Sequence, residues 1–83
     1  MTLDVLYFAW IRERIGTPRE RIETGAATIR DLVDQLIASD ERRAAALSDL
    51  SAIRVAADQE LVDLDHRLEN VREVAFFPPM TGG

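Results

Sequence analysis

The chain closes with Val74-Ala75-Phe76-Phe77-Pro78-Pro79-Met80-Thr81-Gly82-Gly83, and the rest of the sequence is organised around this stretch. Its first four residues form an apolar, strand-like run, which the two prolines end because proline offers no N–H to a sheet ladder. The remaining residues, 78–83, span about 20 Å when extended at roughly 3.3–3.6 Å each. The sequence therefore predicts a folded domain over residues 1–77 and an extended, flexible tail over residues 78–83.

The tail ends in two glycines, Gly82 and Gly83. Glycine has no Cβ, so this end can pass a narrow channel and adopt backbone angles closed to other residues. The terminal carboxylate is then the least hindered reactive group of the molecule. Taken alone, two terminal glycines are more often a frayed end.

The complete ten-residue ending resembles the C-terminus of the small, sulfur-carrying subunits of molybdopterin synthase, which belong to the ubiquitin-like β-grasp family. The resemblance extends to Val5-Leu6-Tyr7-Phe8-Ala9, to Arg12-Glu13 and Gly16-Thr17, and to residues 55–68. It thus covers most of the chain.

Composition agrees with a small globular protein. The 83 residues are 47% hydrophobic and 30% charged, enough for one domain. No apolar run approaches the roughly 20 residues of a membrane span, and the start lacks the basic and apolar regions of a secretory signal, so we expect a cytoplasmic protein and no membrane partner. A formal net charge of −5 argues against nucleic-acid binding and suits a basic partner pocket.

Two residue types are missing altogether. Without cysteine the chain has no thiolate or persulfide of its own, so any sulfur that it carries must sit on the C-terminal carbon. Without lysine, and with only Gly16 and Gly25 outside the tail, it cannot contain a phosphate-binding loop. We therefore expect no cofactor on this chain, and ATP bound by a partner. The chain also offers no lysine on which a polymer of itself could be built.

The first half predicts two strands and two helical segments. Residues 3–9 alternate as a strand that is apolar on both faces towards its end, which indicates the central place in a sheet. Residues 10–15 predict a helical turn ended by Gly16, and residues 19–23 a charged edge strand. A main helix begins after the N-cap Thr28, with Asp31 in its first turn, and its apolar stripe is Ile29, Leu32, Val33, Leu36 and Ile37.

The second half predicts a short helix over residues 41–50, with Leu47 and Leu50 facing the core, and then three strands. Residues 53–57 and 60–62 form a hairpin about Asp58-Gln59, and residues 73–77 form the last strand, able to lie beside the first. Periodicity supports an α+β roll. The resemblance implies the more specific ubiquitin-like β-grasp fold, which is a mixed sheet of about four to five strands crossed by one main helix.

The spacing of the polar residues offers little support for a conventional catalytic or metal site. A triad would need His66, the single histidine, beside Ser39, Ser48 or Ser51, and nothing in the spacing favours it. The acidic residues 58–69 lack the ligand and glycine spacing of a calcium loop. We interpret both as solvated surface and expect no metal.

Phe8, Leu61 and Phe77 allow two interpretations. As apolar residues on strands they are ordinary core candidates, which the pattern alone favours. The resemblance instead implies an exposed apolar surface that binds the activating enzyme and, in turn, the large synthase subunit. By the same resemblance Arg12 supplies a polar rim contact, and the partners bind the tail residues Pro78, Pro79, Met80 and Thr81.

The resemblance also implies a mechanism. An adenylating, E1-like enzyme uses ATP to convert Gly83 to an acyl-adenylate, sulfur replaces AMP to give a thiocarboxylate, and this sulfur is delivered to cyclic pyranopterin monophosphate to form the dithiolene of molybdopterin. The pocket for this sulfurtransferase step is expected on the large subunit, with Gly82 and Gly83 inserted. Two large subunits and two carriers would form a heterotetramer.

The sequence departs from the family pattern at two turns. Asp58 replaces the usual asparagine, and Asn70-Val71-Arg72 replaces Asp-Gly-Asp; because Val71 is poorly suited to positive φ, this turn should have a different shape. Three other functions stay open: a sulfur carrier for thiamine or cysteine synthesis, a ubiquitin-like modifier joined to target lysines through Gly83, and an interaction domain with an inert tail.

Overall fold

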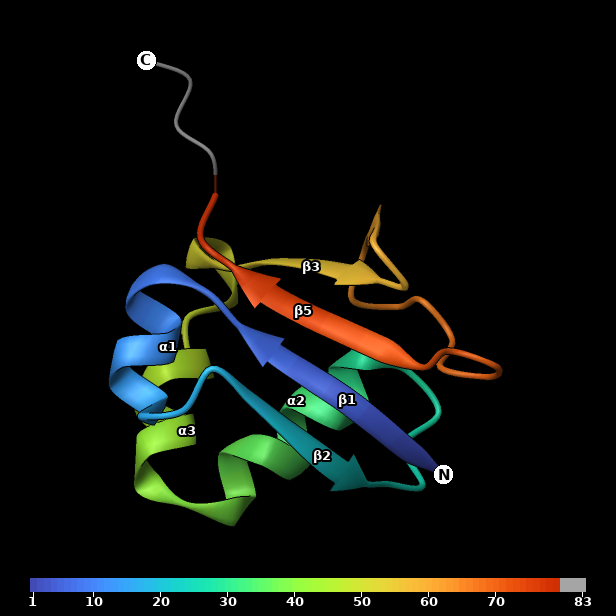
Figure 1. Ribbon diagram of the computed structural model, residues 1–83, viewed down its shortest axis with the longest axis horizontal. Coiled ribbons are helices and arrows are strands. Elements are labelled where there is room, and N and C mark those ends of the chain that lie inside the picture. The colour runs from blue at the N-terminus through green and yellow to red at the C-terminus, as the bar shows by residue number, and fades with distance from the viewer. Residues whose placement is uncertain (80–83) are drawn as a thin grey trace.

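The computed structural model describes residues 1–79 and shows a single mixed sheet covered on one face by helices (Figure 1). The five strands lie in the order β2-β1-β5-β3-β4. They are β1 (Thr2–Tyr7), β2 (Arg19–Glu23), β3 (Arg54–Ala57), β4 (Glu60–Val62) and β5 (Glu73–Phe77). β5 runs parallel to β1 and antiparallel to β3, so the last strand lies beside the first, as predicted.

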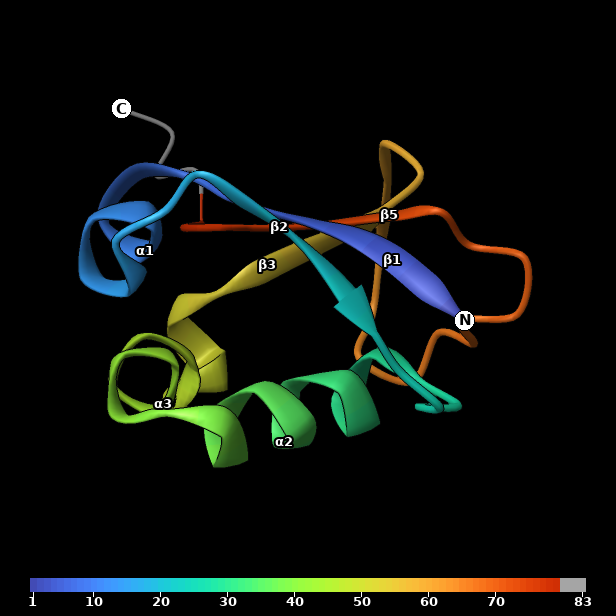
Figure 2. The same ribbon diagram turned by 60° about the horizontal axis from the view of Figure 1, so that its bottom comes forward.

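The main helix, α2 (Ile29–Ser39), lies under the sheet in Figure 2 and turns its predicted apolar stripe towards it. Its start is fixed by Thr28, whose hydroxyl oxygen accepts a hydrogen bond from the Asp31 N–H at 3.2 Å. The shorter α1 (Ala9–Ile15) ends at Gly16, which has φ +94° and supplies the left-handed cap. α3 (Glu41–Leu47) and the 3₁₀ turn η1 (Leu50–Ala52) complete the helical layer.

The core lies between this layer and one face of the sheet. Alternate residues of β1 point into it, and Leu3, Val5 and Tyr7 are at most 1% exposed. They meet the same face of β5 and β3 and the buried side of α2; the other fully buried large side chains are Phe76, Val74, Ile11, Ile29, Leu32, Val33, Leu36, Leu47 and Leu68. Within residues 1–79, every large core residue precedes Phe77.

The first strand differs from the prediction in two details. It is an interior strand between β2 and β5, but β5 holds the middle of the sheet. It also ends at Tyr7, and Ala9 begins α1 with φ +53°. The alternation of residues 3–9 concealed this turn because Ala9 fits either a strand or a helix; the Phe8 carbonyl accepts the Ile11 and Arg12 N–H groups and starts the helix.

Candidate functional site

The face of the sheet opposite α2 is apolar near the end of β5. Leu6, Ala75, Ala56 and Leu61 lie in register across β1, β5, β3 and β4. Phe8 and Phe77 continue the alternation of β1 and β5 on the same face. We call these six residues the apolar patch: Leu6, Phe8, Ala56, Leu61, Ala75 and Phe77.

The patch is open to solvent at its two large ends. Phe8 is 45% exposed and Leu61 66%, while Phe77 is half-buried between them. The pattern-based interpretation of Phe8 and Leu61 as core residues is therefore wrong. For Phe8 it failed because the run from Val5 to Phe8 is apolar on both faces, so alternation could not tell which face packs against the helix.

The other half of this face is charged. Asp4 lies in register with Arg21 on one side and Glu73 on the other. The Asp4 carboxylate forms ion pairs with Arg21 at 3.3 Å and with Arg19 at 3.4 Å. The exposed face thus changes from charged to apolar along the strands, and its apolar half lies where β5 ends.

The path of the chain brings this apolar half to the base of the tail. The Phe8 N–H donates to the Phe76 carbonyl at 3.1 Å, which places the start of α1 against the end of β5. Pro78 and Pro79 follow, both half-buried, and Arg12 lies exposed on α1. Figure 1 shows α1 and the start of β3 on either side of the end of β5. Met80, Thr81, Gly82 and Gly83 lie outside the described residues.

Residues 5–83 match the family model described as the ThiS family. The chain belongs to the ThiS family. Curated relatives agree along the whole length: the molybdopterin synthase sulfur carrier subunit of Escherichia coli K12 is 41% identical, with 98% of this chain and 99% of the relative aligned. The protein of the same name from Mycobacterium tuberculosis H37Rv is 36% identical, with 98% and 96% aligned. The resemblance predicted from the sequence is thus confirmed.

Solved structures confirm the β-grasp arrangement of this ThiS-family chain. SAMP1 from Haloferax volcanii superposes with a TM-score of 0.76 at 26% identity, with all of both chains covered. A chain from the protein–protein complex of subunits 1 and 2 of molybdopterin-converting factor from Helicobacter pylori 26695 gives 0.67 at 23% identity, again over both full chains. None of the helices in the described part of the ThiS-family chain has the length and apolar character that a membrane span requires.

The two turns that depart from the family pattern, at Asp58 and at residues 70–72, contact each other. Asp58 and Gln59 have φ of 49° and 71°, which makes the tight β3–β4 hairpin. The Asp58 carboxylate accepts the N–H groups of Arg72 and Glu73, each at 3.0 Å. Positive φ in the second turn falls on Asn70, at 67°, and not on Val71. Asp58 therefore holds the start of β5, a role that no local pattern indicates.

A second feature that no local sequence pattern indicates is an ionic network that joins β1, β2 and α3. Tyr7 donates its hydroxyl to Glu20 at 2.7 Å, and Arg43 binds both Glu20 and Asp40. Burial and the Glu20 hydrogen bond raise the pKa of Tyr7. Burial alone would raise the pKa of Glu20, but the hydrogen bonds from Arg43 and Tyr7 outweigh it and lower that pKa. The network fixes α3 against the edge of the sheet.

The remaining polar candidates do not assemble into a catalytic site. His66 is exposed, and its backbone carbonyl accepts the Ile29 N–H at 3.1 Å. The hydroxyls of Ser39, Ser48 and Ser51 bond to neighbours within four residues of their own segments. Within residues 1–79, no three acidic or histidine side chains gather as metal ligands would.

Proposed function

We propose that this chain is the sulfur-carrier subunit of a molybdopterin synthase, and that its Gly83 carries the sulfur as a thiocarboxylate. One observation carries the proposal: in a ThiS-family chain, the exposed apolar patch lies at the base of a tail that ends in Gly-Gly. Relatives at 41% and 36% identity bear the name of this subunit over their full length.

The apolar patch is the surface that the partners bind. Phe8, Leu61 and Phe77 present large apolar side chains around the tail, the arrangement expected of interface residues that lose water on binding. Arg12 contributes a polar contact at the rim. Pro78, Pro79, Met80 and Thr81 lie along the partner's channel and hold the terminus at a fixed distance from the patch.

Loading begins with the terminal carboxylate. An α-carboxyl group has an ordinary pKa of about 3.3–3.7 and is ionised at neutral pH. In the activating enzyme, which binds the ATP, a Gly83 oxygen attacks the α-phosphate and pyrophosphate leaves. A sulfur donor then displaces AMP from the acyl-adenylate, so that one terminal oxygen is replaced by sulfur. Gly82 permits the close approach because it has no side chain.

Delivery takes place in the large subunit. The tail inserts the Gly83 thiocarboxylate beside cyclic pyranopterin monophosphate, and its sulfur attacks a carbon of the pterin side chain as an oxygen substituent leaves that carbon, which gives a thioester. Water then cleaves the C(=O)–S bond of the thioester, so that the sulfur stays on the pterin and Gly83 returns to the carboxylate. This chain supplies the sulfur and its position, while acid, base and anion-binding groups belong to the large subunit. Because a dithiolene needs two sulfurs, two loaded carriers are used in turn, in a cytoplasmic heterotetramer.

The intact mass of the carrier tests the loading step. The chain is produced with its native C-terminus beside its own activating enzyme and a sulfur source. We expect the mass change of one oxygen replaced by sulfur, and molybdopterin formation when large subunit and pterin precursor are added. An unchanged mass with a demonstrably active enzyme would overturn the proposal. Deletion of Gly83 is the control: it should abolish both signals, and Gly82→Ala should abolish transfer, without loss of the fold.

A second candidate function, protein modification, has one specific observation in its favour. The structural neighbour from Haloferax volcanii is called small archaeal modifier protein 1. A modifier would form conjugates with lysines of other proteins that resist thiol reductants and vanish when Gly83 is deleted. A carrier for another sulfur pathway would load in the same way but would not copurify with a molybdopterin synthase large subunit.

A further inference from the structure

The charge of the molecule is unevenly distributed between its two ends. Residues 58–60 and 69–73, where β3 turns into β4 and where β5 begins, contain four acids and one arginine, a net charge of −3. At the tail end, α1, residues 48–54 and Asp63, which follows the β4 partner of Val55 and so lies beside Arg54, contain three arginines and three acids, a net charge of zero. The whole chain has a net charge of −5, so the tail leaves from the less acidic end of an acidic protein.

The three arginines of this end come from the two segments that flank the end of β5. We call Arg12, Arg14 and Arg54 the tail-base arginines. Arg54 begins β3 and lies in register with Phe77, the residue before Pro78. Arg12 and Arg14 belong to α1, whose first residue follows Phe8 and its hydrogen bond to Phe76. The three therefore belong to segments that lie on opposite flanks of the end of β5.

None of the three is neutralised by the part of the chain that the structure describes. Within residues 1–79, ion pairs join four other arginines, Arg19, Arg21, Arg30 and Arg43, to acids. Of the three acids at the tail end, Asp49 accepts hydrogen bonds from the N–H and hydroxyl of Ser51, and Asp63 accepts one from the Asp65 N–H. Glu13 occupies the solvent side of α1, opposite the buried Ile11 and Ile15.

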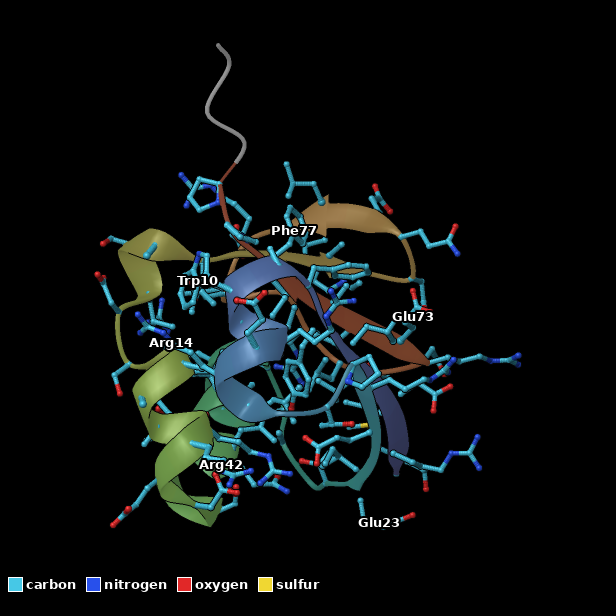
Figure 3. The ribbon with its side chains drawn as sticks, turned by 60° about the vertical axis from the view of Figure 1, so that its left-hand side comes forward. Trp10, Arg14, Glu23, Arg42, Glu73 and Phe77 are labelled. Atoms are coloured by element: carbon cyan, nitrogen blue, oxygen red, sulfur yellow. The ribbon has the colours of Figure 1, made fainter. Side chains whose placement is uncertain are left out.

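Arg14 is also held in place. Its guanidinium lies 5.0 Å from the ring centroid of Trp10, one helical turn earlier, and Figure 3 shows the two side chains together on one flank of α1, with Phe77 beyond them towards the tail. A stacked guanidinium keeps its hydrogen-bond donors free and loses little side-chain entropy when it binds a carboxylate. Trp10, the single tryptophan, stays half-exposed.

We propose that the tail-base arginines bind carboxylates at the mouth of the pocket that receives the tail, on the large subunit of the synthase. This inference rests on the proposed function and deepens it. A protein that takes in residues 78–83 must surround their base, so its rim meets both flanks of β5. The apolar patch contacts it on one side, and Trp10, Arg14 and Arg54 contact it around the end of the sheet.

The names of the relatives support the large subunit as the partner, because both relatives are called subunits of molybdopterin synthase. Complementary charge at the rim orients the carrier as it approaches, with the end that bears the tail-base arginines foremost, and raises the association rate. The acidic far end is repelled by the same carboxylates. The arginines thus select the productive orientation, while the apolar patch supplies most of the affinity.

The test compares two double charge reversals in the full-length carrier. Arg14→Glu with Arg54→Glu changes the tail end. Arg42→Glu with Arg67→Glu makes the same change in net charge at exposed positions elsewhere; Figure 3 shows Arg42 away from the tail. Affinity for the cognate large subunit is measured by calorimetry at low and high salt. Thermal unfolding checks the fold, and the neutral Arg14→Gln with Arg54→Gln replaces the first pair if it unfolds.

We expect the tail-end reversal to weaken binding about tenfold at low salt, and the matched reversal less than about twofold. The difference should shrink as salt rises. Equal losses in both pairs, or no loss in the first, would overturn the assignment while wild-type binding still supports the carrier function. Slower thiocarboxylation with unchanged large-subunit affinity would move the contact to the activating enzyme and overturn it as well. A wild-type carrier that fails to bind would overturn both proposals.

Discussion

Two neighbouring aromatic residues, Phe76 in β5 and Phe8 directly after β1, have opposite roles, which mutation can separate. Phe76 is fully buried and stacks near Tyr7, with ring centroids 6.2 Å apart, whereas Phe8 is 45% exposed. Phe76→Ala should lower the free energy of unfolding by about 3–5 kcal/mol. Phe8→Ala should change it by less than about 0.5 kcal/mol but weaken large-subunit binding by about 1–2 kcal/mol. Urea unfolding and calorimetry measure the two effects, and a strongly destabilised Phe8→Ala would contradict the placement of this side chain.

Asp58 is an exposed residue whose removal should nevertheless destabilise the fold. Its carboxylate accepts two backbone N–H groups at the start of β5, at a backbone φ of 49°. Asp58→Ala loses both bonds and strains the turn, so we expect a loss of about 1–3 kcal/mol in the free energy of unfolding. Asp58→Asn keeps an acceptor oxygen and tolerates the same φ, and should stay within about 0.5 kcal/mol of the wild type. Equal losses in the two variants, measured by urea unfolding, would argue against the carboxylate as the anchor of β5.

At the scale of the elements, Glu20 makes the attachment of α3 depend on pH. Because the pKa of Glu20 is lowered in the folded state, its contribution to stability is complete above the ordinary value of 4.5 and is lost as the pH falls through the lowered pKa. Glu20→Gln should therefore be less stable than the wild type at neutral pH and should flatten the acid side of the stability profile. Asp34→Asn, at an exposed position of α2, is the control. If Glu20→Gln left the acid side of the stability profile unchanged, Glu20 would not be the source of this pH dependence.

The elements themselves could be predicted from the sequence, because their signals are local. Thr28 and Asp31 indicate the start of α2, Gly16 indicates the end of α1, and the prolines after Phe77 indicate the end of β5. The faces of the strands could not be predicted in the same way, since Leu6 and Phe8 are as apolar as Leu3 and Val5. Only the packing of α2 against one side decides which of them become the patch.

The contacts that join distant elements were likewise beyond local patterns. Asp58 binds Arg72 and Glu73 across 14 and 15 residues, and Glu20 meets Arg43 across 23. Such pairs depend on which strands become neighbours. The sequence could still locate the candidate site in outline, because the resemblance matches Phe8, Leu61 and Phe77 one by one. The position of Arg54 beside Phe77 needed the structure, since it depends on strand register.

At the scale of the whole molecule, folding and delivery should be separable. All the large core side chains of the described part of the chain precede Phe77, so a chain ending at that residue should melt at the same temperature as the full chain, in calorimetric scans at equal concentration. It should neither load sulfur nor support molybdopterin synthesis. A large fall in melting temperature would show that residues 78–83 belong to the folded unit, against the predicted boundary after residue 77.

The length of the tail provides the sharpest test of delivery, because the apolar patch and the Gly83 sulfur must reach their places in the partner together. Deleting Met80 keeps both prolines and both glycines but shortens the reach by about 3.5 Å. Since misplacement of reacting atoms by about 1 Å can reduce rates about 100-fold, we expect transfer of sulfur to the pterin to be nearly abolished, while affinity for the large subunit falls little. Met80→Ala, which preserves the length, should retain most of the transfer. Single-turnover assays with thiocarboxylated carrier measure this step apart from loading, and equal transfer by the two variants would mean that the tail does not set the position of the sulfur.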